Sequence, residues 1–180
     1  CVKPMSKENF CSAPFKTIEI MTTGKARICC KMLDTYATKP DGSHYLIQND
    51  KLSDIWNSDW IKNYRQRFIN NERPAECKMC WDDEAAGIRS MRQDFGEIGE
   101  KYIANPPLKV LVLKLSNKCN CACRICGFEL SSLWQQELVK SGRWNSFDNI
   151  LVENNDVDKI NTDNWEDMKK IFGELSQLLI

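Results

Sequence analysis

The sequence predicts an α+β module, made of a β-hairpin and helices, followed by the first βα portion of an α/β domain. Two extended apolar stretches on either side of a glycine-containing turn predict the hairpin over residues 15–30. The pair Pro106-Pro107 blocks any helix from crossing it, and Leu108 to Leu115 then suits the first strand of a parallel barrel or half-barrel. The chain therefore divides into a module over residues 1–105 and the beginning of a second domain over residues 106–180.

Hydrophobic spacing predicts the helices of the first module. Residues 34–50 include a Pro-Asp-Gly turn and predict a loop. Aromatic side chains then recur at steps of four and predict one helix over residues 54–69 with a buried face. These side chains are Trp56, Trp60, Tyr64 and Phe68. The segment from Trp81 to Phe95 predicts a shorter, charged helix.

The second part of the chain predicts two further helices. Glu129 to Lys140 follows the predicted strand as a helix, and the acidic segment 141–162 predicts irregular structure. Asp163 with Glu166 resembles a capping box. It predicts a last helix that carries five apolar side chains on one face. They are Trp165, Met168, Phe172, Leu175 and Leu179.

The charge balance and the composition exclude several classes of function. The 25 basic and 25 acidic residues cancel, so neither nucleic acid nor a charged membrane surface is expected as a partner. We find no signal peptide and no apolar stretch long enough to span a bilayer. The arginines between residues 65 and 92 are expected to form a solvated face, and His44, the single histidine, is expected to be a solvated loop residue.

The ten cysteines are clustered, which argues against a secreted disulfide scaffold. Thiolate ligands need a reducing compartment, so we expect the protein to be cytoplasmic. The strongest chemical signal is a C-x3-C-x2-C loop directly after the predicted strand, formed by Cys119, Cys123 and Cys126. Three thiolates hold three corners of a cubane iron–sulfur cluster and leave one iron open to a small molecule, whereas a closed structural site uses four protein ligands.

Zinc is the alternative for this loop, because Cys121 brings the number of cysteines between residues 119 and 126 to four. Zinc sites usually combine two C-x2-C arms that lie apart in the sequence, which favours the cluster. A disulfide is disfavoured because cysteines this close in a loop close only very small rings.

A second set of cysteines lies upstream. The predicted hairpin brings Cys11 and the pair Cys29/Cys30 to the same end. Neighbouring strand residues point to opposite faces, so only one of that pair faces Cys11. Cys77 and Cys80 form a C-x2-C arm, whose spacing lets two thiolates reach one metal centre. Together these residues supply four ligands, the number for a closed site, and on the thiolates alone zinc suits them as well as an iron–sulfur cluster.

The run from Lys114 to Gly127, with the strand before it, resembles the cluster loop of the radical SAM (S-adenosylmethionine) enzymes. The resemblance implies a 4Fe–4S cluster on Cys119, Cys123 and Cys126 whose open iron binds SAM. One electron then splits SAM to methionine and a 5′-deoxyadenosyl radical, which abstracts hydrogen from a substrate, either a peptide or a small molecule. It also implies an electron donor such as flavodoxin or ferredoxin. Ile125, where the family often has an aromatic residue, could pack near the adenine.

The upstream region resembles the SPASM/twitch module, an auxiliary-cluster domain that accompanies many radical SAM enzymes. The matching residues are Cys11, Gly24 with Cys29 five positions on, Cys77 and Cys80, and the Gly-x4-Cys spacing favours Cys29 over Cys30. The resemblance implies one auxiliary 4Fe–4S cluster on these residues and therefore two 4Fe–4S clusters in all. The alternative function is a non-catalytic zinc-binding interaction module built on the same thiolates.

The radical SAM resemblance also implies a partial TIM barrel, of which residues 106–180 would hold the first strand and roughly two helices. The family's Gly-Gly-Glu segment, which holds the amino group of SAM, should lie on the next strand and is not found; Gly173-Glu174 is expected to lie within a helix. We therefore expect the chain to be an incomplete fragment of such an enzyme, with an incomplete SAM site.

Overall fold

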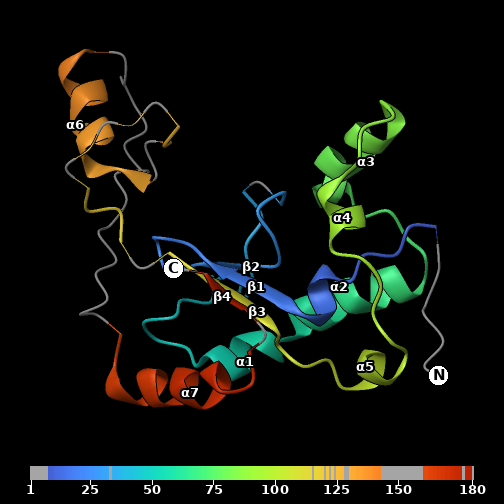
Figure 1. Ribbon diagram of the computed structural model, residues 1–180. Helices are drawn as coiled ribbons and strands as arrows, with labels where there is room; N and C mark the ends of the chain where they lie inside the picture. The colour runs from blue at the N-terminus through green and yellow to red at the C-terminus, as the bar shows by residue number, and fades with distance from the viewer. Residues whose placement is uncertain are drawn as a thin grey trace.

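The computed structural model has one four-stranded sheet, with strand order β2-β1-β3-β4, and helices packed around it (Figure 1). It describes residues 8–32, 34–114, 116–119, 121, 123, 125–127, 130–142, 160–175 and 177–179. The segment 143–159, for which irregular structure is predicted, therefore lies outside the described residues.

The predicted hairpin is confirmed. Strands β1 (Thr17–Ile20) and β2 (Ala26–Arg27) pair antiparallel, with Glu19 opposite Arg27. The turn between them contains Gly24 at a φ of +79°, a left-handed conformation that glycine adopts without the steric cost of a Cβ atom. The amide of Met21 donates to the carbonyl of Lys25 and closes the turn at 2.9 Å. The predicted loop that follows forms only isolated bridges, Lys25–Leu46 and Thr38–His44.

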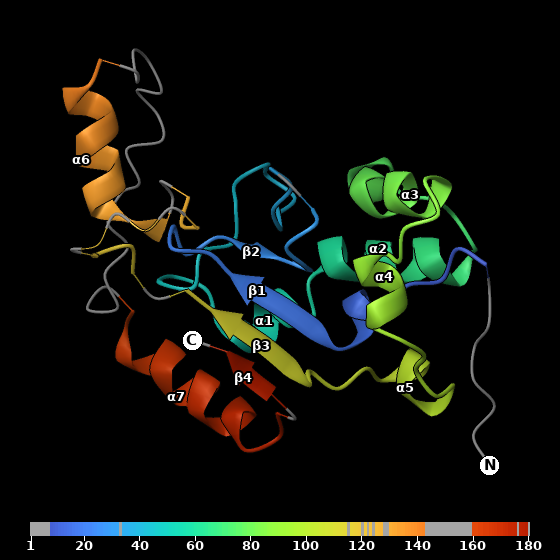
Figure 2. The ribbon, with the colours of Figure 1, turned by 45° about the horizontal axis from the view of Figure 1, so that its top comes forward.

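The predicted strand after the proline pair is also confirmed, as β3 (Val110–Leu113). It pairs parallel with β1 of the hairpin and, on its other side, with β4 (Gln177–Leu179) (Figure 2). Strands from both sides of the predicted boundary at residue 105 thus share one sheet. The division into two domains remains a prediction.

The prediction of one helix over residues 54–69 is wrong in one respect, because the structure has two helices in this region. Helix α1 (Leu52–Trp56) ends before Asn57, and α2 (Asp59–Ile69) begins after Ser58. Ser58 has an extended backbone, and its side chain caps α2 by accepting from the amide of Ile61 at 3.4 Å. A residue that caps a helix in this way interrupts the helical backbone before it.

The helix predicted from Trp81 to Phe95 is likewise divided. Helix α3 (Lys78–Ala85) ends shortly before Gly87, whose φ is +75°. Helix α4 (Met91–Asp94) then begins with a capping box between Ser90 and Gln93. The module also contains the 3₁₀ turns η1 (Ala13–Phe15) and η2 (Ala75–Cys77), and a short helix α5 (Lys101–Ala104).

The C-terminal part has helices α6 (Ser132–Lys140) and α7 (Thr162–Phe172). Asn161, rather than Asp163, caps α7, because its side chain accepts from the amide of Asn164 at 2.9 Å. The helix ends with Gly173 as its C-cap, so the prediction that its apolar face continues to Leu179 is wrong. The chain instead turns into β4, whose Gln177 amide donates to the Lys109 carbonyl at 2.9 Å.

Two apolar cores hold the structure together. One lies between the sheet and helices α1 and α7, with Ile18, Ile20, Leu111 and Leu113 fully or almost fully buried. Hydrogen bonds fix α7 there: Asp167 accepts from the Ser53 hydroxyl at 2.8 Å and from the Ser53 amide at 2.9 Å. The second core surrounds η1 and α2 and includes Phe15 and Phe68. None of the helices in the described ranges is both long and apolar enough to cross a membrane.

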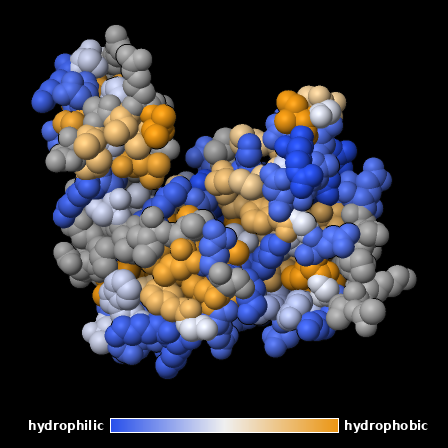
Figure 3. Space-filling view, viewed as in Figure 1, coloured by the Kyte–Doolittle hydropathy of each residue, from blue (hydrophilic) through white to orange (hydrophobic). Residues whose placement is uncertain are grey.

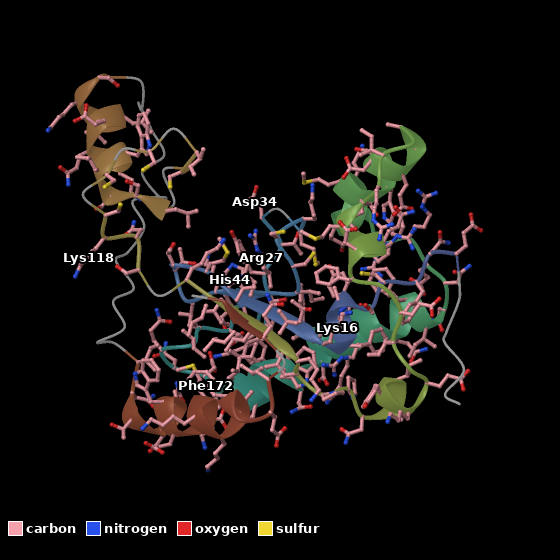
Figure 4. The ribbon with its side chains drawn as sticks, viewed as in Figure 1. Lys16, Arg27, Asp34, His44, Lys118 and Phe172 are labelled. Carbon is pink, nitrogen blue, oxygen red and sulfur yellow. The ribbon has the colours of Figure 1, made fainter. Side chains whose placement is uncertain are left out.

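On the face seen in Figure 3, hydrophobic residues gather on the α6 lobe, at the tip of α3 and across the middle of the view, among hydrophilic ones. The expectation that the arginines from 65 to 92 are solvated is wrong for Arg65, which is 7% exposed. Arg65 donates to the carbonyls of Pro14 at 2.8 Å and Trp56 at 3.0 Å, so it joins η1 to α1. His44, which is labelled in Figure 4, is half-buried rather than solvated, and its ring meets that of Tyr36 in a T-shaped arrangement.

Candidate metal centre

Four of the predicted ligands line one cavity, although they come from distant parts of the chain. Phe68 of α2 and Phe95, just after α4, form part of its apolar wall, together with Met32. The cysteines are Cys11, Cys29, Cys77 and Cys80. All cysteines in the described residues are free thiols. The structure therefore brings together the set that the sequence predicts for the auxiliary site.

The fold explains how each thiol reaches the cavity. Cys11 precedes η1, which leads into the start of β1, and Cys29 follows the end of β2. Because β1 and β2 are antiparallel, these two residues lie beyond the same end of the hairpin. Cys77 is the residue before α3 and Cys80 lies on its first turn, so the two are neighbours on one helix surface.

The structure separates Cys29 from Cys30, although both follow the end of β2 at Arg27, so strand alternation does not account for the separation. Cys29 is part of the cavity lining, whereas Cys30 is exposed. The structure thus places Cys29, and not Cys30, among the other three thiols. Its role as a ligand remains a prediction.

The cavity disfavours bare thiolates. Burial, reinforced by the neighbouring thiols, raises the pKa of Cys11 far above its ordinary value and raises the pKa of Cys77 to about 12. Burial is also the largest cause that raises the pKa of Cys29 to about 12. Thiols in this state become thiolates only when a cationic group replaces their protons, so binding must release protons.

The chemistry of the donor set fits a thiolate-bound iron–sulfur group. Four cysteines around one cavity match the number that holds a 4Fe–4S cluster. Among the described residues, no group of three or more His, Cys, Asp or Glu side chains converges to hold a metal ion, and this holds for the cavity cysteines and for those of the loop after β3.

Two cationic side chains, Lys31 and Arg92, complete the lining. Arg92 forms a bidentate ion pair with Glu84 and lies with its guanidinium 4.8 Å from the ring centre of Trp81. The sequence analysis missed Arg92, because it counts this residue only among the solvated arginines. Its guanidinium is neutralised by Glu84, so the pair adds no net charge beside the cavity.

The second predicted group lies at the other side of the sheet. Cys119 follows the carboxyl end of β3, which is parallel to β1, so it lies beyond the opposite end of the sheet from Cys11. Both ribbon views agree, with α6 on one side of the sheet and α3 on the other (Figures 1 and 2). Sulfur atoms gather beside α6 and, separately, beside α3 (Figure 4).

Helix α6 holds the loop of Cys119, Cys123 and Cys126 through its first residues. The hydroxyl of Ser132 accepts from the Cys119 amide at 3.2 Å, and the indole N–H of Trp134 donates to the Cys123 carbonyl at 2.8 Å. The hydroxyl of Ser131, the N-cap of α6, donates to the carbonyl of Cys121 at 2.9 Å. The Ser-Ser pair before the apolar helix was a readable capping signal that the sequence analysis missed.

In this loop, the thiols of Cys119 and Cys123 both lie near that of Cys121. The pKa of Cys121 is raised, first by the thiol of Cys119 and then by that of Cys123. The amide of Cys126 donates to the Cys123 carbonyl at 3.1 Å, which forms a tight turn between these two residues. Asn120, Ala122 and Arg124 lie outside the described residues. Ile125, the residue before Cys126, is 96% exposed, so its apolar side chain packs against little of the protein.

Comparison with known proteins supports the upstream site. Residues 11–81 match the family model of SPASM, described as an iron–sulfur cluster-binding domain. The matched range begins at the first cavity cysteine and ends directly after the last. No curated protein and no solved structure matched the chain. The match supports an auxiliary iron–sulfur cluster domain of the kind associated with radical SAM enzymes.

Proposed function

We propose that the chain is an iron–sulfur protein of the radical SAM type, with one auxiliary 4Fe–4S cluster and one SAM-binding 4Fe–4S cluster. The observation that carries the proposal is the cavity lined by Cys11, Cys29, Cys77 and Cys80, which lies inside the region matching an iron–sulfur cluster-binding domain. Four thiols satisfy all four irons of a cubane cluster. The auxiliary cluster is therefore closed to substrate.

The SAM-binding cluster is assigned to Cys119, Cys123 and Cys126. Their number leaves one iron without a protein ligand. The first turn of α6 lies against this loop, and the positive end of its helix dipole favours an anionic cluster there. Exposed Ile125 supplies an apolar surface beside Cys126 for the adenine of SAM. The bound group would supply an electron for reductive cleavage of SAM, with a flavodoxin- or ferredoxin-like protein as donor.

The remaining assignments follow from this chemistry. The substrate is a peptide or a small molecule that gives up a hydrogen atom. The proposed location is the cytoplasm, because thiolate ligands need a reducing compartment. Neither a nucleic acid nor a membrane is among the proposed partners.

Iron counting tests the two-cluster proposal. Anaerobic reconstitution of the full chain should load about eight irons, and Cys77→Ala and Cys123→Ala should each remove about half. Cys30→Ala is the matched control, because this thiol is exposed outside the cavity, and it should keep the full complement. A colourless chain that takes up one or two zinc ions and excludes iron would overturn the proposal in favour of a zinc-binding interaction module.

SAM binding is tested on the reduced protein. SAM binding is expected to be weak, so SAM in large excess should be needed to change the electron paramagnetic resonance (EPR) signal of the cluster held by Cys119, Cys123 and Cys126. The change should persist in Cys77→Ala, which removes only the auxiliary cluster, and should disappear in Cys123→Ala. A signal that SAM leaves unaltered in the parent chain would contradict the SAM assignment while leaving the auxiliary cluster intact.

A further inference from the structure

We infer that Arg92 is the positioning residue of the auxiliary cluster, an inference that rests on the proposed function. Its guanidinium ties the segment entering at Cys11 to the helix that carries Cys80, and it neutralises the Glu84 carboxylate beside the cavity. Arg92 lines the same cavity as the four cysteines.

The hydrogen bonds of Arg92 join two separate parts of the ligand set. One terminal nitrogen, Nη1, donates to the carbonyl of Phe10 at 2.8 Å and to that of Glu8 at 2.9 Å. Phe10 is the residue directly before Cys11. Arg92 therefore fixes the backbone from which the first ligand extends.

The other side of the guanidinium is bound to α3. Nε donates to Glu84 at 2.8 Å and Nη2 donates to the second oxygen of the same carboxylate. The guanidinium also lies 4.8 Å from the ring centre of Trp81, the residue directly after Cys80. Bidentate pairing and stacking fix both the position and the plane of an arginine in a way that a lysine cannot reproduce.

Glu84 is itself held in place, so the arrangement is rigid. It accepts from the hydroxyl of Ser90 at 2.5 Å, and the hydrogen bonds from Arg92 lower the pKa of its carboxyl. The Arg92 and Glu84 side chains are only 11% and 19% exposed. This largely buried ion pair joins α4 to α3, the helix that carries Cys80, so it acts on the position of that ligand, whereas an exposed surface pair would contribute little.

The charge of Arg92 has a separate consequence. One electron from dithionite reduces a 4Fe–4S cluster from the 2+ to the 1+ core, which makes the thiolate-bound cluster more negative by one charge. In the parent chain Arg92 offsets the charge of Glu84, and without Arg92 the Glu84 carboxylate would be left as an uncompensated anion that disfavours the reduced form, since burial and charge around a cluster set its potential. Removing the cation should therefore make the reduction potential more negative.

The experiment uses the full chain in a Cys119→Ala/Cys123→Ala/Cys126→Ala background, so that only the auxiliary cluster is present. Arg92→Gln should release iron to a chelator about 10- to 100-fold faster than this parent, the usual cost of losing an outer-shell partner. Its reduction potential, measured by EPR-monitored titration, should be more negative. Arg89→Gln is the matched control, because Arg89 pairs with Asp94 on the surface and is 72% exposed.

Arg92→Lys separates the two roles. It keeps the charge but loses the bidentate and stacked geometry, so iron release should accelerate while the potential stays near that of the parent. If Arg92→Gln fails to fold by circular dichroism, the lysine variant decides the matter through the same two readings. Iron release as slow as in Arg89→Gln, together with an unchanged potential, would overturn the inference. A parent that loads no cluster would instead overturn the proposed function.

Discussion

Glu19 should be among the most consequential charged residues for stability, because it joins three strands of the sheet. Its carboxylate accepts from Arg27 Nε on β2 at 2.6 Å and pairs with Lys114 Nζ, just after β3, at 2.7 Å. Glu19 is 3% exposed and Arg27 6%. The change Glu19→Gln preserves the volume of the side chain and removes only its charge.

The expected cost is about 3 kcal/mol in the free energy of unfolding. Breaking a buried ion pair by removing one partner costs about 3–5 kcal/mol, because the other charge is left buried and unpaired. Arg27 is that unpaired charge here. Lys114 is one quarter exposed and can turn toward water, so the lower end of the range applies. For a chain of this length, such a loss lowers the melting midpoint by about 6–12 °C.

The assay is urea denaturation of the reduced protein without metal, followed by circular dichroism. Glu166→Gln is the control, because Glu166 pairs with Lys169 on the surface and its loss should leave the midpoint unchanged. A loss below about 1 kcal/mol for Glu19→Gln would refute the reasoning, since it would place the pair in the range of exposed ion pairs.

The same pair predicts a pH dependence with a definite sign. Burial alone would raise the pKa of Glu19, but the hydrogen bonds and charges of Arg27 and Lys114 outweigh it and hold the pKa below the ordinary value of 4.5. A group with a depressed folded-state pKa stabilises the fold fully above its unfolded pKa and loses that contribution as pH falls through the folded value. The stability difference between the parent and Glu19→Gln should therefore shrink below about pH 4.5.

Three further predictions concern the hairpin turn and the two cysteine sites. Gly24→Ala should cost about 1–2 kcal/mol for a Cβ in the left-handed region, plus the displacement of Gln48, whose side-chain oxygen would lie 2.0 Å from that Cβ. Gly42→Ala, with a φ of +86° and open space, should show only the backbone cost in the same urea titration. Binding of iron by the auxiliary thiols should tighten as pH rises across the neutral range, measured by chelator competition, because burial raises the pKa of Cys77 to about 12 and binding releases protons. Ser131→Ala, which removes the N-cap of α6, should speed iron release from the loop cluster and spare the auxiliary one; equal release from both would contradict the assignment of α6 to the loop.

Local patterns were enough to predict the hairpin, the strand after the prolines and the presence of helices. The hairpin prediction depended on Gly24 between two extended stretches, and its antiparallel pairing brings Cys11 and Cys29 to one end. The closeness of Cys11 to Cys29 and the one-turn spacing of Cys77 and Cys80 are local features, so the sequence was able to reveal them. The meeting of the two pairs in one cavity depends on packing between distant segments.

The errors arose where packing between distant segments decides the structure. The apolar residues after Phe172 continue a helical pattern, but pairing with β3 draws residues 177–179 into the sheet. Ser58 divides the helix predicted over residues 54–69 because its side chain caps α2. Arg92 was counted as a solvated residue because its partners, Glu84 and the Phe10 carbonyl, meet it only when α4 packs against the N-terminal segment.

The sheet gives a physical reason to expect that the two groups of cysteines bind iron independently of each other. Cys11 and Cys29 lie beyond one end of the β1–β2 pair, and Cys119 lies beyond the opposite end, after β3. Four residues of strand β1 span about 13 Å at a rise of about 3.3 Å per residue. A thiolate at one end therefore cannot replace a lost ligand at the other without unfolding the sheet between them. This separation is why Cys77→Ala and Cys123→Ala should each remove half of the iron, and why loss of all iron from either variant would mean that the cysteines form one shared site.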